Sequence, residues 1–141
     1  STSMGGRQLR RWISDPLIDI NEINERLDAV KELKDNMMLK GDIVDSLKRV
    51  YDIERLIGKI SYGNANGRDM VSLKNSIAQL PSLKQVLSRT ESKMLKGLYS
   101  ELDELKDIYE LIDKSINNTL ETDKLSIVNW SELPFAIPLF T

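Results

Sequence analysis

The 141-residue sequence predicts an all-α multi-helix bundle, with one long helix in its C-terminal half and an irregular apolar tail. Apolar residues recur at intervals of three and four along most of the chain, which is the spacing of one helical face. Glycine and proline number only 7 and 4, so few positions interrupt helices. Before the tail, no stretch of useful length alternates apolar and polar residues as a strand does.

The first strongly periodic segment is predicted as a helix over residues 20–33. Its apolar positions, spaced by three and four, are Ile20, Ile23, Leu27, Val30 and Leu33. Asp19 precedes them and can accept amide hydrogen bonds, while Glu22 favours the positive end of the helix. Pro16 lacks an amide hydrogen and restricts Asp15 to extended geometry, so residues 7–13 form a separate segment.

Further helices are predicted on both sides of a turn at residues 63–67. The first carries Leu39, Ile43, Val44, Leu47 and Val50, and Ile53, Leu56, Ile57 and Ile60 continue or follow it. Residues 63–67 read GNANG, and Gly and Asn tolerate positive φ. Asn66 or Asp69 can cap the next helix, which carries Met70, Leu73, Ile77 and Leu80 and is expected to stop at Pro81. A short segment with Leu83, Val86 and Leu87 follows.

The longest pattern predicts one helix of about 25 residues, roughly 37 Å long. Its positions step by three and four: Leu95, Leu98, Leu102, Leu105, Tyr109, Ile112 and Ile116. We interpret them as a seam buried within an antiparallel bundle, with an intermolecular coiled coil as the alternative. The tail then carries Trp130, Leu133, Phe135, Ile137, Leu139 and Phe140. Pro134 and Pro138 bar a regular helix there.

Composition excludes several kinds of chemistry. The chain has no cysteine and no histidine, which removes disulfides, thiolate zinc sites, cysteine nucleophiles and imidazole bases. No GxxxxGK[ST], GxGxxG, GxSxG or HExxH motif is present. We therefore expect no catalytic, cofactor-binding or metal-binding residue and no enzyme activity in this chain. No apolar run reaches the ~20 residues of a membrane span, and we expect a cytoplasmic protein.

The charge is nearly balanced, with 20 basic and 22 acidic residues, which is unlike a free-standing nucleic-acid binder. Basic residues are in excess at residues 1–14, which carry a net charge of +3, and at residues 61–99. The cations of the second segment are Arg68, Lys74, Lys84, Arg89, Lys93 and Lys96. We favour solvated helix faces for them. A surface that contacts phosphates is the alternative, although no aromatic residue lies among them to stack on bases.

Two motifs go beyond generic helix patterns. The first comprises MGGRQLRRWI at residues 4–13, PLI at 16–18 and INERLDAV at 23–30. The second comprises YDIERL at 51–56, GKI at 58–60, GNAN at 63–66, RD at 68–69 and Leu73. In this order and spacing, over roughly residues 4–116, they resemble the helical core (lever) domain of bacterial MutS-family DNA mismatch-repair ATPases.

The resemblance implies a role in a larger protein. Family members are dimers that clamp DNA, kink it at a mismatch and couple this to a distant ATPase that uses ATP and Mg. The core domain is the helical hub between the connector, clamp and ATPase, and it is inactive alone. On this basis residues 1–119 are the first core segment before the clamp insertion, and residues 120–141 are a tail that does not align to the family. Its partners would be the other domains, DNA through the full-length protein and a second subunit.

Two other functions remain open at this stage. The chain could be an independent helical protein-interaction module, and a downstream GxxxxGK[ST] in the same reading frame would argue against this. It could also bind DNA directly through residues 68–96, which a salt titration would detect. Whatever its role, we expect the chain alone to self-associate, preferably as a two-fold pair that exchanges its apolar tails.

Overall fold

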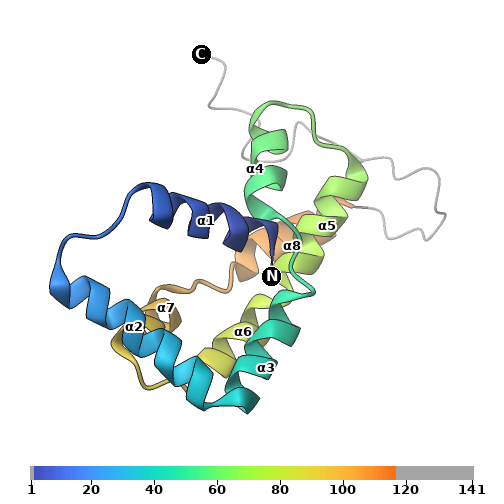
Figure 1. Ribbon diagram of the computed structural model, residues 1–141. Coiled ribbons are helices and arrows are strands. Elements are labelled where there is room, and N and C mark those ends of the chain that lie inside the picture. Colours follow the sequence, from blue (N-terminus) through green and yellow to red (C-terminus); the bar gives the residue numbers. More distant parts are fainter. Residues whose placement is uncertain (1, 117–141) are drawn as a thin grey trace. The chain divides into compact units, whose positions relative to one another are not determined.

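The computed structural model describes residues 2–116, and these fold entirely into helices and their connections (Figure 1). The all-α class is therefore confirmed. The helices are α1 (Ser3–Ser14), α2 (Ile20–Asp35), α3 (Met37–Leu47), α4 (Ile53–Ser61), α5 (Gly67–Ile77), α6 (Leu80–Leu87), α7 (Lys93–Glu101) and α8 (Lys106–Ser115). Among the described residues, no helix has both the length and the apolar character needed to cross a membrane.

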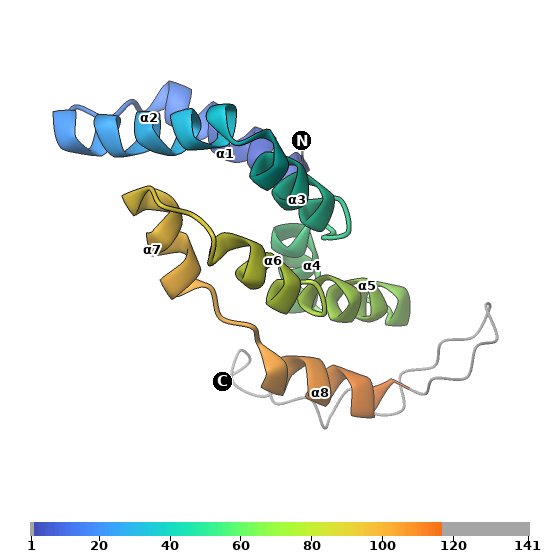
Figure 2. The same cartoon turned by 90° about the horizontal axis from the view of Figure 1, so that it is seen from below.

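The chain forms two compact units, each with its own core. Unit 1 comprises the residues up to Asp52 together with Gln79–Glu104, and so contains α1, α2, α3, α6 and α7. Within it α3 packs on α6 and α2 packs on α7, so two consecutive pairs of helices face each other (Figure 2). Its buried apolar residues are Ala29, Leu39, Leu80, Leu87 and Leu95.

Among the described residues, unit 2 comprises Ile53–Ala78 and residues 105–116, with α4, α5 and α8. Helix α5 packs on both α4 and α8. Its buried apolar residues are Leu56, Met70, Leu73, Ile77, Ile112 and Ile116. Ser76 is also fully buried, and its hydroxyl donates to the carbonyl of Ser72 at 2.8 Å, so this polar group is satisfied inside the core.

The predicted helix starts are confirmed at two positions. The side chain of Asp19 accepts hydrogen bonds from the amides of Asn21 and Glu22, at 2.7 and 3.2 Å. Asn66 forms a complete capping box with Asp69, in which each side chain accepts from the other's backbone amide. Both caps satisfy amides that have no partner within their own helix.

The prediction that Pro81 stops a helix is wrong. Helix α5 ends earlier, at Ile77, and Pro81 lies in the first turn of α6. Proline is well suited to that place, because the amides of a first turn have no carbonyl partner within the helix and the fixed φ already matches it.

The prediction of one long helix over residues 95–116 is also wrong. Helix α7 ends at Glu101, Leu102 is extended with ψ 108°, and Leu105 has a left-handed φ of 52° before α8 begins. The carbonyl of Leu102 accepts a hydrogen bond from Lys84 Nζ at 2.7 Å instead of continuing the helix. The break coincides with the boundary between the two units. The coiled-coil alternative, which needs a continuous helix, is likewise excluded.

The apolar stripe of α2 is only partly buried. The helix packs through the side that carries Ala29, with Ile23 and Leu33 half-buried at its edge. Ile20, Leu27 and Val30 are exposed. Periodicity therefore located the stripe correctly but not the direction in which the helix packs. The predicted tail, residues 120–141, and its boundary after residue 119 lie outside the described residues.

Candidate functional site

The two sequence motifs are joined by an ion pair between their charged residues. Arg7, in the first turns of α1, donates to both carboxylate oxygens of Asp52, at 2.9 and 2.7 Å. The hydroxyl of Ser3 donates to the same carboxylate at 2.8 Å. Both ion-pair partners are partly buried, and a two-pronged guanidinium–carboxylate contact fixes orientation as well as distance. Arg7 and Asp52 thus tie α1 to the residue that precedes α4.

A second contact joins two residues of the first motif. The guanidinium of Arg26 on α2 lies 3.9 Å from the centre of the Trp12 ring on α1. A cation over an aromatic face is attracted by the negative charge of the ring face. Trp12 is half-buried. Leu9 and Ile13, on the same helix, are exposed.

A third contact joins two residues of the second motif. Lys59 on α4 donates to Asp69 at 2.7 Å, and Asp69 is the acidic member of the capping box of α5. The hydrogen bonds from Lys59 and from the Asn66 amide hold the pKa of the Asp69 carboxyl below its usual value. This carboxylate therefore both starts α5 and connects it to α4.

These three contacts explain why the motif residues occur together. Each charged or aromatic group named above has its partner within the same unit, so these residues position helices. Their contacts orient the helices and pack them together. Among the described residues, no group of three or more acidic side chains is arranged to hold a metal ion. The absence of catalytic and cofactor residues stays a prediction.

Glu32 is a positioning residue that the sequence did not reveal. From α2 its carboxylate accepts the backbone amides of Glu91 and Ser92, at 2.6 and 2.8 Å, at the start of α7. Partial burial acts to raise the pKa of Glu32, but these hydrogen bonds and the charge of Lys96 outweigh it, so the pKa lies below its usual value. Its partners lie 59 and 60 residues away along the chain, so no spacing of residues in the sequence indicates this contact.

The cations considered as a phosphate-contacting surface are already engaged within the chain. None of the six lacks a partner, and five donate to a carboxylate or a carbonyl. The pairs are Lys74 with Asp113, Lys84 with the Leu102 carbonyl, Arg89 with Asp42, Lys93 with Glu25 and Lys96 with Glu91. A cation that faces its own carboxylate attracts phosphate less strongly. The geometry therefore favours the interpretation as solvated, internally paired helix faces.

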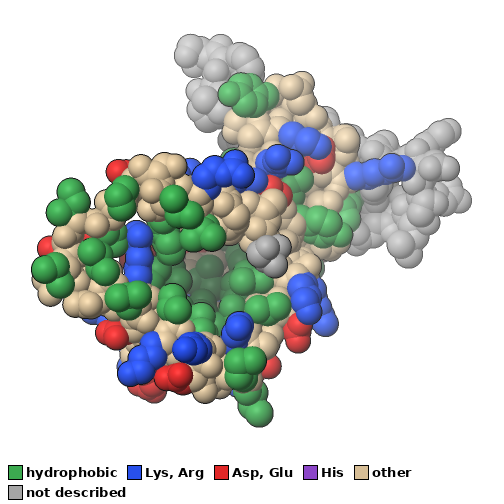
Figure 3. Space-filling view, in the orientation of Figure 1, with side chains coloured by type: hydrophobic (Ala, Val, Ile, Leu, Met, Phe, Trp, Pro, Cys, Tyr) green, Lys and Arg blue, Asp and Glu red, His purple; other side chains and the backbone are tan. Residues whose placement is uncertain are grey.

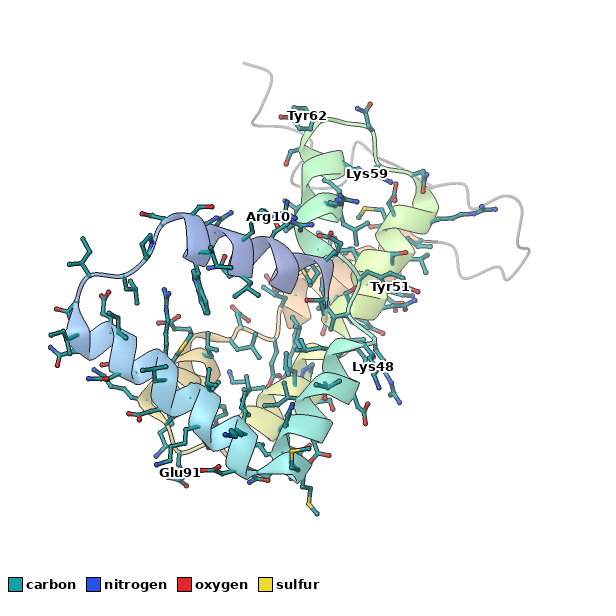
Figure 4. The ribbon with its side chains drawn as sticks, in the orientation of Figure 1. Arg10, Lys48, Tyr51, Lys59, Tyr62 and Glu91 are labelled. Carbon is teal, nitrogen blue, oxygen red and sulfur yellow. The ribbon has the colours of Figure 1, made fainter. Side chains whose placement is uncertain are left out.

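The surface of unit 1 also carries an open hollow of about 260 Å³ between α3 and α6. Its lining is mainly polar and includes Asp42 and Asp45. Asp42 is bound by Arg89, and Asp45 accepts from Lys48 at 2.8 Å, so both carboxylates have a cation of their own. Figure 4 shows the side chains of the described residues, including Lys48 near the end of α3. These two carboxylates are therefore not free to hold a cation from solution.

Comparison with known proteins decides the family. Residues 1–131 match the family model described as MutS domain III. The chain belongs to the MutS family. This confirms the resemblance carried by the two motifs.

Individual MutS relatives agree with this assignment. The chain is 54% identical to the DNA mismatch repair protein MutS of Clostridium kluyveri and 56% identical to that of Caldicellulosiruptor bescii, each over 116 residues. It is 51% identical to that of Clostridium tetani over the same length. Each alignment covers 82% of this chain and 13% of the relative. The chain thus corresponds to a small part of the length of these MutS proteins.

Proposed function

We propose that this chain is the helical core segment of a bacterial DNA mismatch-repair protein, and that it couples the mismatch-binding and clamp regions to an ATPase. The observation that carries the proposal is the Arg7–Asp52 pair, because it joins the two motifs that also carry the resemblance to MutS. A coupling element needs helices whose orientation is fixed, and this pair, the Trp12–Arg26 contact and the Lys59–Asp69 pair each fix one helix against a neighbouring segment of its own unit.

The proposal includes the partners of the longer protein. The core segment contacts other domains of the same polypeptide and meets DNA only through the full-length protein. That protein acts as a homodimer in the cytoplasm, and it holds ATP and Mg in a domain outside this chain. The 141-residue chain itself has no activity.

The coupling role can be tested in a chimaera. The 116 residues of this chain that align with the Clostridium kluyveri MutS protein would replace the corresponding segment of that protein, to which they are 54% identical. ATP turnover is then measured with homoduplex and with G·T-mismatched DNA. In the chimaera, Asp52→Asn should reduce the mismatch-dependent change in ATP turnover at least about fivefold and leave the turnover without DNA unchanged. A fivefold effect corresponds to the lower end of typical coupling free energies.

Asp45→Asn is the matched control, because it removes one carboxylate charge from an exposed pair with Lys48. It should leave the mismatch response unchanged. If both variants respond to mismatches like the parent chimaera, Arg7 and Asp52 have no coupling role. A chimaera that folds but shows no mismatch response at all would favour the alternative, an independent protein-interaction module.

The absence of activity in the chain alone is tested separately. Titration calorimetry of the 141-residue chain with Mg-ATP should give no binding heat at micromolar nucleotide, and G·T and homoduplex oligonucleotides should bind equally. Micromolar binding of ATP, or a several-fold preference for the mismatch, would contradict this part of the proposal.

A further inference from the structure

The turn between α4 and α5 ends in the one asparagine of the sequence that is followed by glycine, Asn66 before Gly67. The turn lies at the surface of unit 2, where basic and acidic side chains are exposed near it (Figure 3). Asn66 is exposed, and Gly67 is the first residue of α5. Glycine has no Cβ, so its backbone nitrogen can approach the preceding side chain closely. By this criterion Asn66 is the asparagine of the chain that reacts most readily with its own backbone.

The reaction is a deamidation that needs only water as a co-reactant. The backbone nitrogen of Gly67 attacks Cγ of Asn66. A bond forms between this nitrogen and Cγ, the bond from Cγ to Nδ2 breaks, and the proton of the attacking nitrogen leaves with Nδ2 as ammonia. Water then opens the cyclic imide, with its hydroxyl going to the carbonyl carbon and its proton to the nitrogen. Opening at Cγ gives aspartate, and opening at the main-chain carbonyl gives isoaspartate.

The folded chain holds Asn66 in a geometry that opposes this attack. Its Oδ1 accepts from the backbone amide of Asp69 at 3.0 Å, and its own amide donates to Oδ2 of Asp69 at 3.1 Å. Its backbone is extended, with φ −113° and ψ 175°. Ring closure turns Cγ onto the nitrogen of Gly67 and breaks the hydrogen bond that Oδ1 accepts. The capping box must therefore open before Asn66 reacts.

Lys59 extends this restraint to α4. Its Nζ donates to Oδ1 of Asp69 at 2.7 Å, so the carboxylate that completes the capping box is itself held from α4. The side chain of Asp69 is only 13% exposed, which protects both of its contacts from water. Figure 4 labels Lys59 and Tyr62 at this end of unit 2. Loosening of the contact between α4 and α5 thus reaches Asn66 through a single carboxylate.

We propose that Asn66 is a self-catalysed modification site, at which opening of the capping box of α5 sets the rate of deamidation. The start of a helix opens locally for a small fraction of the time, and Asn66 reacts only from that open form. The rate is then the product of the open fraction and the rate of the unrestrained Asn66–Gly67 pair. This site is independent of the proposed coupling role.

The two products differ in their effect on α5. Aspartate at position 66 keeps a side-chain oxygen for the amide of Asp69, and aspartate caps helices as well as asparagine does. Isoaspartate adds a methylene group to the main chain directly before Gly67 and leaves its free carboxylate on Cα. Neither the path of the chain nor the acceptor then matches the cap, and the amides of the first turn lose their partner. We expect isoaspartate, but not aspartate, to loosen the start of α5.

Mass spectrometry of the full 141-residue chain tests the site. The chain is incubated in alkaline buffer made with water enriched in the heavy oxygen isotope, and its peptides are mapped over time. Asn66 should be the first asparagine modified, and its product should carry the heavy oxygen. In guanidinium chloride the modification should be at least about tenfold faster, because the cap is absent in the unfolded chain. Earlier modification of another asparagine in the folded chain, or equal rates at Asn66 with and without denaturant, would overturn the proposal.

Substitutions test whether the capping box sets the rate. Asp69→Ala removes one half of the box and should speed the modification of Asn66 about fivefold, the factor that corresponds to a typical helix cap. Lys59→Met keeps both hydrogen bonds of the box but frees Asp69 from α4, so it should give a smaller increase. Asp28→Ala is the matched control, since it removes an exposed carboxylate on α2 and should leave the rate unchanged.

Circular dichroism of each variant confirms that the helices are intact. An unchanged rate in folded Asp69→Ala, or a larger increase with Lys59→Met than with Asp69→Ala, would refute control by the capping box.

Hydrogen exchange distinguishes the two products. The isoaspartyl fraction, separated by chromatography, should exchange the amides of residues 67–70 several-fold faster than the unmodified chain, because the first turn of α5 opens more often. The variant Asn66→Asp should exchange them at the rate of the unmodified chain. Equal exchange in the isoaspartyl fraction and in Asn66→Asp would contradict the effect assigned to isoaspartate.

Discussion

Asp52 accepts hydrogen bonds from the guanidinium of Arg7 and from the hydroxyl of Ser3. Its side chain is only 17% exposed, and that of Arg7 is 33% exposed, so water competes weakly for either group. Exposed ion pairs elsewhere in the chain, such as Lys48 with Asp45, remain well solvated. At the scale of single residues, partly buried contacts stabilise this fold, whereas exposed ion pairs contribute little to its stability.

We expect Asp52→Asn to lower the free energy of unfolding by about 1–3 kcal/mol, because it leaves partly buried donors of Arg7 with a weaker acceptor. Urea titration followed by circular dichroism measures the change. Asp45→Asn, on the exposed pair, should have no measurable effect. Equal effects of the two substitutions would show that burial of Asp52 does not strengthen its contacts.

Glu32 should make the stability of the chain depend on pH. Its pKa is lower in the folded chain than the ordinary value of 4.5, so the folded state binds fewer protons than the unfolded state in that range. The stabilisation is present above pH 4.5 and is lost as the pH falls through the lowered pKa. The difference in unfolding free energy between wild type and Glu32→Gln should therefore be largest at neutral pH and shrink below about pH 4.

The same titrations with Asn21→Ala supply the control. Asn21 is exposed, and its side chain does not titrate. The difference between wild type and this variant should not change with pH. A pH-independent difference for Glu32→Gln as well would mean that its hydrogen bonds to α7 contribute little.

Among the helices, the starts of α2 and α5 were predictable because their caps are local. Asp19 and Asn66 bind amides two or three residues away, so spacing alone reveals them. The break between α7 and α8 was not predictable in this way. Leu102 and Leu105 keep the apolar spacing of the seam, although one is extended and the other left-handed. Apolar spacing reports which residues face a core, and it continues when the chain passes from one core to another.

The cap of α5 predicts a measurable contribution. Asn66→Ala should lower the free energy of unfolding by about 1 kcal/mol, because the amide of Asp69 loses its acceptor, whereas Asn66→Gly should cost only a few tenths of that. Asn64→Ala, in the same turn, removes a side chain that does not cap a helix and should have a smaller effect. Differential scanning calorimetry of the three variants ranks them, and an order with Asn64→Ala as the most damaging would contradict the role of Asn66.

At the scale of the whole chain, the described residues contain two cores, and the sequence predicted only one bundle. Local patterns identified most core residues, including Leu73, Ile77 and Ile112, but did not indicate which of them share the same core. That assignment depends on contacts between segments far apart in the chain, such as Lys74 with Asp113. The sequence identified the motif residues but not which of them pair, because spacing is a local property and pairing joins segments far apart in the chain.

Two cores predict that a substitution in one acts mainly there. Ile112 is 1% exposed, and Ile112→Ala should cost about 2–5 kcal/mol through lost burial and a cavity. Hydrogen exchange should then accelerate in α4, α5 and α8 more than in α2 and α6. Ile57→Ala, at a residue that is 52% exposed, should change exchange little in either unit. Uniform acceleration in all helices after Ile112→Ala would show that the units unfold as one.

The hydrogen bonds from the start of α7 to Glu32 also bear on the order in which the chain folds. A helix whose cap lies next to it in sequence can form its first turn from local contacts alone. The amides of Glu91 and Ser92, in contrast, donate to a carboxylate that lies 59 and 60 residues earlier in the chain. Closing a loop of that length costs chain entropy before the contacts that offset this cost can form. Helix α7 is thus expected to consolidate late, after α2 has folded. In kinetic terms, Glu32→Gln should speed unfolding and leave the folding rate almost unchanged.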